Sequence, residues 1–242
     1  MTILHSIKEL ALKAGVEVNW YIPGQSDTAR LFKLLDFHKI DTVIDVGAND
    51  GGYGKALRRG GYSDAILSFE PLESAHVKLV HASRGDVAWE IAPRMAIGSS
   101  NGEIEINVAG NSYSSSILPM QSLHEALVPQ SRYVGTEKVP LNRLDAVAHP
   151  FIEQSNNLLL KIDTQGYELP VLEGAESLLK RVRGIQLEMS LVPLYEGQML
   201  YKETIDWLEA KGFELWSVMP GFVDRTSGRM LQMDGVFFRV QS

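Results

Sequence analysis

The stretch VIDVGANDGGYG, from Val43 to Gly54, decides the fold. Its first four residues, three of them apolar, read as the end of a buried strand that Gly47 stops, which predicts a tight turn there. Helix-forming sequence follows. A glycine turn between a strand and a helix lets the backbone approach a ligand and directs helix N–H groups at it. The stretch therefore predicts the start of a ligand-binding α/β fold.

Outward from this stretch, strands alternate with helices. Strands are predicted at 41–46, 65–69, 87–91, 158–162 and 184–188, with helices at 169–180 and 202–210. Gly212 stands where a left-handed helix cap is expected. The alternating piece 103–108 lies inside a long connection, and the segments 213–218 and 235–240 read as a terminal pair of antiparallel strands.

Two further helical patterns precede the first strand. One begins at Ile3 and repeats its apolar residues to Ala14, and the other runs to His38 after a capping Ser26. We therefore expect one Rossmann-like, doubly wound α/β domain. Its seven-stranded, mostly parallel sheet would end in the antiparallel C-terminal pair. Residues 1–40 would form an N-terminal helical extension and 41–242 the main domain.

Composition restricts the function classes. The 242 residues include no cysteine, which excludes disulfide scaffolds, thiol nucleophiles and iron–sulfur ligation. A net charge of −7 with scattered basic residues argues against a nucleic-acid partner. No apolar stretch approaches the length of a membrane span, and the N-terminus lacks the uninterrupted apolar core of a secretory signal. We predict a cytoplasmic protein, and the N-terminal helices are compatible with a homo-oligomer.

The turn after the first strand favours one kind of cofactor. Dinucleotide enzymes place a second glycine where this chain has Asn49, so a pyrophosphate fits less well. Asp45, inside the strand end, suits a positively charged cofactor such as S-adenosylmethionine. Glu70 ends the second strand, where a carboxylate can accept hydrogen bonds from both ribose hydroxyls, and Pro71 stiffens the next turn. Singly, Asp45 could equally be a buried hydrogen-bonded group and Glu70 an exposed strand-end charge.

A second stretch, LLLKIDTQGYELPVLEGA, runs from Leu158 to Ala175. Its strand ends at Asp163, which should project at the carboxyl edge of the sheet. This carboxylate could bind the cofactor, take a proton from an attacking hydroxyl, or hold Mg²⁺ with Glu188 at the end of the next strand. Alternatively, Asp163 only caps a helix. The sequence assigns no role to Lys161 and does not require a metal.

These stretches together resemble the FkbM-type S-adenosylmethionine-dependent methyltransferases. The resemblance rests on IDVGAND (44–50), SFEPL (68–72), RLD (143–145), LKIDTQGYELPVLEGA (160–175) and GIQLEMS (184–190). It implies a Rossmann-like seven-stranded sheet and methyl transfer to a hydroxyl, often on a sugar or a polyketide-type natural product. The acceptor itself does not carry over.

The resemblance also implies roles for particular residues. It assigns the methionine and ribose side of the cofactor to Asp45, Gly47, Ala48 and Asn49, and the ribose to Glu70. It puts Asp163 at the edge of the transfer site and the adenine near 95–97. Our candidate cofactor-binding residues are Asp45, Gly47, Ala48, Asn49, Gly51, Tyr53, Glu70, Pro71, Ala96 and Asp163.

The acceptor side is less defined. The segment from Ala109 to Thr136 is predicted as a long loop with six serines and two formal charges, which suits a hydroxylated acceptor. We expect Tyr113 and the serines at 114–116 to approach that acceptor. The candidate catalytic residues are Asp163, Glu188 and the loop residue His124, although a lone loop histidine is usually only solvated.

Two alternatives remain open at this stage. One is an NAD-dependent oxidoreductase with a similar sheet, disfavoured by Asn49 and by the absence of a Tyr-x-x-x-Lys pair. The other is a non-catalytic nucleoside-binding or interaction module. The sequence fixes neither the acceptor nor the general base, the metal dependence or the oligomeric state.

Overall fold

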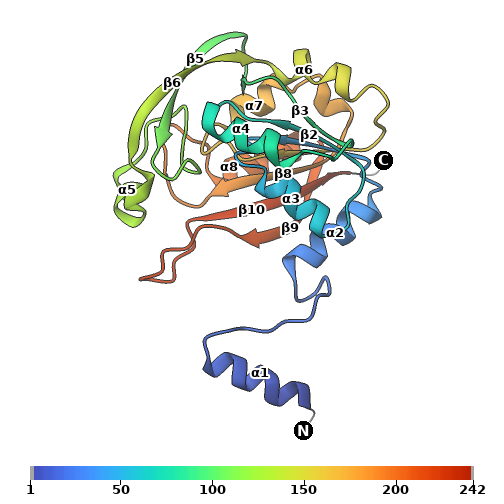
Figure 1. The fold of residues 1–242 in the computed structure, drawn as a ribbon, viewed down its shortest axis with the longest axis vertical. Coiled ribbons are helices and arrows are strands. Elements are labelled where there is room, and N and C mark those ends of the chain that lie inside the picture. Colours follow the sequence, from blue (N-terminus) through green and yellow to red (C-terminus); the bar gives the residue numbers. More distant parts are fainter. Residues whose placement is uncertain (1–2, 241–242) are drawn as a thin grey trace. The chain divides into compact units, whose positions relative to one another are not determined.

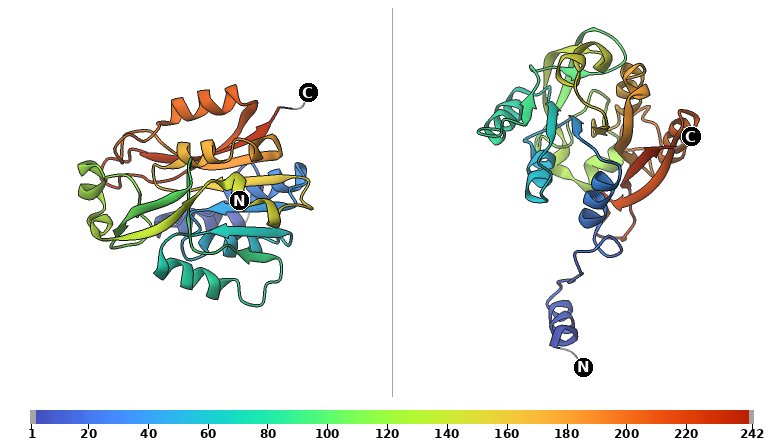
Figure 2. Two further views of the ribbon diagram at one scale, coloured as in Figure 1. Left: turned by 90° about the horizontal axis from the view of Figure 1, so that it is seen from above. Right: turned by 90° about the vertical axis from the view of Figure 1, so that its right-hand side faces the viewer.

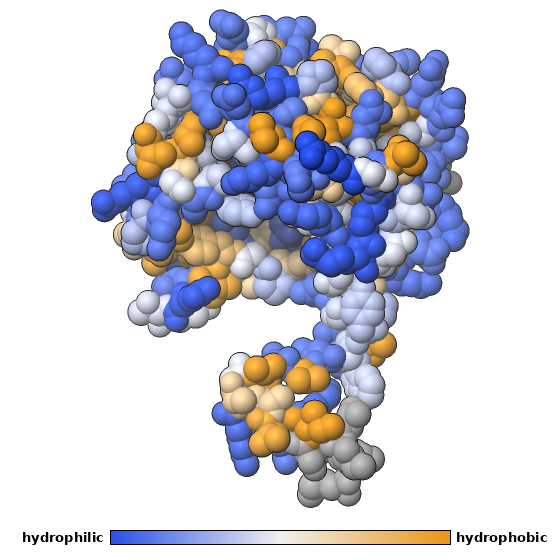
Figure 3. All heavy atoms as spheres, in the orientation of Figure 1, coloured by the Kyte–Doolittle hydropathy of each residue, from blue (hydrophilic) through white to orange (hydrophobic). Residues whose placement is uncertain are grey.

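The computed structural model describes residues 3–240, which divide into two compact units, one up to Lys39 and one from Ile40 onward. The first unit contains α1 (Ile3–Lys13) and α2 (Asp27–Phe37). The predicted cap is present, since the Ser26 hydroxyl oxygen accepts a 3.2 Å hydrogen bond from the Ala29 N–H. Apolar side chains gather on α1 (Figure 3), where Ile7 and Leu10 are exposed.

The larger unit is built on a seven-stranded sheet with the order β3-β2-β1-β7-β8-β10-β9 (Figures 1 and 2). These strands are β1 (Thr42–Val46), β2 (Ala65–Phe69), β3 (Trp89–Ile91), β7 (Leu158–Ile162), β8 (Val182–Ser190), β9 (Phe213–Pro220) and β10 (Gln232–Arg239). Each strand pairs in parallel with the next along the series β3, β2, β1, β7 and β8, and β10 is antiparallel to both β8 and β9. The predicted Rossmann-like, mostly parallel sheet with an antiparallel C-terminal pair is confirmed.

Helices connect the strands and supply the core. They are α3 (Gly52–Arg59), α4 (Glu73–Ala82), α5 (Ser122–Leu127), α6 (Leu144–Val147), α7 (Glu168–Gly174) and α8 (Tyr201–Ala210), with 3₁₀ turns at Pro129–Ser131, His149–Phe151 and Leu178–Lys180. One continuous apolar core joins side chains of α6, α7 and α8 to one face of the sheet. Gly212 has a φ of +82°, as the predicted left-handed cap requires.

The helix predicted at 169–180 is wrong in its second half, because α7 ends at Gly174. The Asp145 carboxylate accepts hydrogen bonds from the N–H groups of Ser177 and Leu178. These bonds start a separate 3₁₀ turn at Leu178–Lys180. A side-chain cap from a residue 32 or 33 positions away carries no periodic signal.

The long connection also differs from the prediction. It forms a second sheet with the order β4-β6-β5, made of β4 (Ala96–Ile97), β5 (Gly102–Ala109) and β6 (Tyr133–Asn142). The predicted loop at 109–136 therefore contains α5, and its last residues lie in β6. The alternating piece 103–108 is confirmed as a strand, within β5. In the described part of the chain, no helix is both long enough and apolar enough to cross a membrane.

One face of the main sheet carries a buried polar row. Ser68, Asp45, Lys161 and Gln186 are aligned on the adjacent strands β2, β1, β7 and β8, and all four are buried. Two residues further along on the same face are Glu70, Gly47 and Asp163, each directly after the end of its strand, and Glu188 inside β8. The polar row therefore lies directly beneath the edge where the predicted site residues project.

Candidate active site

A pocket opens at the carboxyl ends of β1, β2 and β7, the place where open parallel sheets bind ligands. Its empty space, together with the open solvent at its mouth, is about 680 Å³. The wall is mixed, with apolar residues such as Phe69 and Ile97 beside carboxylates and hydroxyls. The lining residues are Val46, Gly47, Asn49, Phe69, Glu70, Pro71, Leu72, Met95, Ala96, Ile97, Ile106, Ser112, Tyr113, Ser115, Ser116, Ile117, Asp163, Thr164, Gln165 and Tyr167.

The turn after β1 gives the pocket its floor. Gly47 has a φ of +81°, and Asn49 is left-handed with a φ of +47°. The Asn49 N–H thereby points at Glu70 and donates a 2.8 Å hydrogen bond to its Oε2 atom. An asparagine tolerates this conformation better than most residues. Asn49 thus fits this turn through its backbone geometry.

Glu70 is a buried carboxylate inside the pocket. Its two oxygens accept 2.8 Å hydrogen bonds from the N–H groups of Asn49 and Leu72. Burial raises the pKa of Glu70 to about 7, although the two N–H groups oppose that rise. The side chain is 4% exposed, so an exposed strand-end charge, the alternative considered above, is wrong. Each oxygen keeps a further lone pair for a ligand hydroxyl.

The structure brings six of the candidate cofactor residues to the pocket wall: Gly47, Asn49, Glu70, Pro71, Ala96 and Asp163. Met95 and Ile97 line it as well, so the whole segment expected near an adenine faces this space. Tyr113, Ser115 and Ser116 also line the pocket, whereas Ser114 does not.

Four candidate cofactor residues lie outside the wall: Asp45, Ala48, Gly51 and Tyr53. Gly51 packs against Leu79 and Trp89, and the Ala48 N–H donates to a β2 carbonyl. The Tyr53 hydroxyl donates a 2.8 Å hydrogen bond to Gln186. These residues build the turn and the helix packing behind the pocket, and the cofactor contact expected of them stays a prediction.

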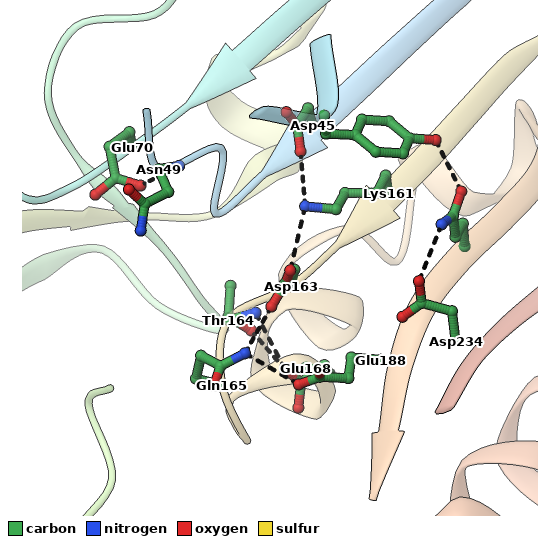
Figure 4. A network of polar contacts seen from close by, with 12 residues as sticks. Asp45, Asn49, Glu70, Lys161, Asp163, Thr164, Gln165, Glu168, Glu188 and Asp234 are labelled. Carbon is green, nitrogen blue, oxygen red and sulfur yellow. Dashed lines mark hydrogen bonds and ion pairs between the residues drawn. The ribbon is translucent and has the colours of Figure 1, made fainter. Parts of the chain in front are cut away.

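Asp45 occupies the interior of the polar row. It is fully buried, and its Oδ1 atom lies 3.1 Å from the Lys161 Nζ atom (Figure 4). Burial lowers the pKa of Lys161, but Asp45 and Asp163 outweigh it and hold this pKa above its usual value. Lys161 therefore stays charged in the core. The sequence prediction put Asp45 at the cofactor. The strand pairing that places Lys161 opposite Asp45 is a tertiary feature, so the sequence alone did not reveal this ion pair.

Gln165 connects the two predicted carboxylates. Its Nε2 atom donates to Asp163 Oδ1 at 2.8 Å and to Glu188 Oε2 at 3.0 Å (Figure 4). Its Oε1 atom accepts from the Tyr195 hydroxyl at 2.9 Å, and its carbonyl accepts from Ser116 at 2.7 Å. The backbone is left-handed, with a φ of +54°, which is strained for glutamine.

Sequence reasoning missed Gln165 and gave Lys161 no role. The signal was the strand-end string KIDTQG, in which both residues flank Asp163. Their side chains become interpretable only when β1 and β8 lie beside β7.

Glu188 lies behind the amide of Gln165 and does not line the pocket. Burial raises its pKa well above the usual value, and Asp163, Glu168 and Asp234 raise it further. The Gln165 Nε2 atom bridges the two carboxylates that the sequence considered as one option for Mg²⁺. Among residues 3–240, no group of three or more histidine, aspartate or glutamate side chains suits a metal ion.

His124 is buried in α5, where its ring packs edge-on against Tyr195 at 5.3 Å and near Phe222 at 5.8 Å. Burial lowers its pKa, so the ring is neutral near pH 7. It does not line the pocket. The segment around His124 folds as a helix instead of the predicted open loop, and the catalytic role expected of this residue stays a prediction.

The model of the methyltransferase FkbM domain matches residues 45–215. The chain belongs to the FkbM methyltransferase family. The family prediction is confirmed, and with it the assignment to methyltransferases over oxidoreductases. The matched segment contains both sheet-edge stretches and the pocket between them.

Individual relatives are more distant. The 2-O-methyltransferase NoeI of Sinorhizobium fredii (strain NBRC 101917 / NGR234) is 26% identical over 189 residues, which are 75% of this chain and 76% of NoeI. Among solved structures, a putative tRNA (m1A22) methyltransferase of Streptococcus pneumoniae, in complex with S-adenosyl-L-methionine, is 14% identical at a TM-score of 0.47 and covers 88% of this chain and 73% of its own. The magnesium protoporphyrin IX methyltransferase ChlM of Synechocystis PCC 6803, with bound SAM, is 10% identical at 0.44, with coverages of 88% and 80%. At these scores, no residue's role transfers from the solved structures.

Proposed function

We propose that this FkbM methyltransferase uses S-adenosylmethionine to methylate a hydroxyl group of a sugar, glycan or related natural product. The observation that carries the proposal is the pocket itself. The carboxylate of Glu70, which accepts two backbone hydrogen bonds, and the accessible carboxylate of Asp163 lie on the walls of one cavity at the strand ends.

The pocket suits this cofactor in several respects. Glu70 has free lone pairs for two ribose hydroxyls, and Met95 and Ile97 offer an apolar wall to an adenine. The Asp163 side chain is 40% exposed and brings negative charge to the methionine side. S-adenosylmethionine supplies an electrophilic methyl group on a sulfonium, whose positive charge a nearby carboxylate favours. The same features fit a dinucleotide less well, since Asn49 narrows the approach of a pyrophosphate.

The acceptor side supports a neutral, hydroxylated substrate. Ser112, Ser115, Ser116 and Tyr113 line the pocket beside Asp163, and none of them carries a charge at pH 7. Such groups can both donate to and accept from hydroxyls. The name of NoeI, a 2-O-methyltransferase, points to the same acceptor atom. We therefore favour oxygen over nitrogen or carbon as the methyl acceptor.

This chain's part in the transfer is to align the acceptor oxygen, exclude water and take one proton. As the new O–CH₃ bond forms and the S–CH₃ bond breaks, the hydroxyl proton needs an acceptor. Of the two carboxylates on the pocket wall, Glu70 is assigned to the ribose, which leaves Asp163 to take this proton. Gln165 orients this carboxylate, and Glu188 accepts a second hydrogen bond from the same Gln165 Nε2 atom. Asp163 is thus our proposed base and Glu188 a supporting residue.

Calorimetric titration with S-adenosylmethionine, S-adenosylhomocysteine and NAD⁺ tests the cofactor first. We expect micromolar binding of the first two, near −8 kcal/mol, and none of NAD⁺. A mass-spectrometric screen of sugars, glycans and polyketide alcohols then tests the acceptor. Methylated oxygen supports the proposal, and a product methylated only on nitrogen or carbon contradicts it. Binding of NAD⁺ alone contradicts the cofactor assignment, and cofactor binding with no transfer to any acceptor favours a non-catalytic binding module.

A further inference from the structure

Lys161 is a charged lysine at the last position but one of the central strand β7, with only 10% of its side chain exposed. It lies directly opposite Asp45 of β1 in the parallel register, and its ammonium lies 5.2 Å from the centre of the Tyr53 ring. Buried ion pairs contribute little to stability, since desolvation offsets their attraction. A need for stability alone therefore does not explain this lysine.

The same ammonium also lies beside a carboxylate of the pocket wall. Its Nζ atom lies 3.6 Å from Oδ2 of Asp163, two residues further along the same face (Figure 4). The other oxygen, Oδ1, accepts from Gln165. Each carboxylate oxygen of Asp163, the proposed base, thus has its own partner: Oδ2 has the Lys161 ammonium, and Oδ1 has the Gln165 amide. Of the three carboxylate and ammonium groups in this line, only Asp163 faces the pocket.

We propose that Lys161 is a positioning residue, which anchors Asp163 to the buried Asp45 and so fixes the direction of its carboxylate in the pocket. The inference rests on the proposed function and adds a residue to it. Asp45 has a matching part, because it keeps the ammonium in the core without reaching the ligand. The buried pair Asp45–Lys161 then supports the Asp163 carboxylate from within the sheet.

Other charged or titratable groups face this line from the neighbouring elements. Tyr53 comes from α3, Glu188 from β8 and Asp234 from β10. Asp234 acts on Lys161 at longer range and accepts a hydrogen bond from Gln186. Neither Glu188 nor Asp234 forms an ion pair with Lys161 within 4 Å among the described residues. The close partners are Asp45 and Asp163, so the test addresses these two.

The test is a coupling experiment. Asp45→Leu with Lys161→Met replaces the buried pair by apolar side chains of similar shape, an exchange that leaves no uncompensated charge in the core. Asp163→Asn is then introduced into the unaltered chain and into this double variant, and the affinity for S-adenosylmethionine is measured by calorimetry. If Lys161 positions Asp163, we expect Asp163→Asn to weaken binding about tenfold in the unaltered chain and less than about threefold in the double variant. Turnover should show the same loss of coupling.

Two controls separate positioning from folding. Glu70→Gln lies in the same pocket without touching Lys161, so it should weaken binding by the same factor in both backgrounds. The same exchange at the exposed pair Lys202–Asp206 of α8 should change nothing. Circular dichroism and melting temperature report folding. If the apolar pair does not fold, Asp45→Asn with Lys161→Gln takes its place.

The outcomes are distinct. An equal effect of Asp163→Asn in both backgrounds would overturn the inference and leave Lys161 as the partner of Asp45 alone. An unaltered chain that binds no S-adenosylmethionine would instead overturn the proposed function, and the inference with it.

Discussion

A Cβ atom on Gly47 would lie 1.9 Å from the backbone carbonyl oxygen of Asp163. The two stretches that predicted the site therefore meet through their backbones, with the end of β1 against the end of β7. Gly47 also has a φ of +81°, where a side chain is strained. The glycine we expected for ligand approach serves first to let these two strand ends come together.

Gly47→Ala should therefore destabilise the protein and distort the pocket. Strain from the positive φ and displacement of the Asp163 carbonyl both contribute, and we expect a loss of at least about 2 kcal/mol in the free energy of unfolding. Urea denaturation measures this loss. Gly61→Ala is the matched control, because Gly61 has a φ of +94° with nothing within 4 Å of a Cβ atom. It should cost about 1 kcal/mol. Equal costs for the two variants would show that the contact with Asp163 is relieved without strain.

Cofactor binding should depend on the ionisation of Glu70. Burial raises its pKa to about 7, and the ionised form is the better acceptor for two hydroxyls. Affinity for S-adenosylmethionine should then increase up to about tenfold between pH 6 and 8, since the ionised fraction of a group with this pKa rises about tenfold. Calorimetry across this range measures the change.

Glu70→Gln should bind more weakly and lose this part of the pH dependence, whereas Glu73→Gln, an exposed neighbour on α4, should keep it. The difference between the variants removes any titration of the cofactor itself. A pH profile that is identical with and without Glu70 would contradict the prediction.

Most of the sheet could be predicted from sequence because its strands are short apolar runs bounded by glycine, proline and charge. The strand at 65–69 matches β2. The second sheet could not, since β4 has only two residues and β6 contains the polar segment GTEK. β4 depends on pairing with β6, and β6 depends on pairing with β5, and no local pattern encodes either pairing.

The same distinction between local pattern and distant pairing applies to the residues of the site. Residues that project at strand ends, such as Glu70 and Asp163, could be predicted because strand direction alone places them. The partners that hold them could not. Lys161 pairs with Asp45 across strands 116 positions apart, and Gln165 meets Tyr195 across 30. The RLD motif also has a structural part, since Asp145 accepts from Arg143 and from the N–H groups at 177–178.

Glu168 should make stability fall as pH rises from about 4.5 to 7. Burial raises its pKa to about 7, although the N–H groups of Gly166 and Thr164 donate to its Oε1 atom. Between the two pKa values the unfolded chain has released this proton and the folded chain retains it. The contribution is therefore complete below pH 4.5 and lost as pH rises through 7, and it amounts to about 3 kcal/mol at most.

Urea unfolding at pH 5, 6, 7 and 8 measures this slope. Glu168→Gln keeps an oxygen for the same donors and should give a flatter profile, with a gain in relative stability at pH 8. Glu173→Gln, on the exposed side of α7, should leave the profile unchanged. Parallel profiles for Glu168→Gln and the unaltered chain would refute the assignment.

His124 should be replaceable without loss of catalysis. Its ring is buried between Tyr195 and Phe222, and its Nδ1 atom has no hydrogen-bond partner among the described residues. His124→Phe keeps an aromatic ring in this contact, so folding should persist and turnover should stay within about threefold. His124→Ala should instead lower stability by about 2–4 kcal/mol through the cavity it leaves, again with little effect on turnover in the folded fraction. Steady-state kinetics and thermal melting separate the two effects. A hundredfold loss of turnover in a folded His124→Phe protein with normal cofactor affinity would return this histidine to the catalytic machinery.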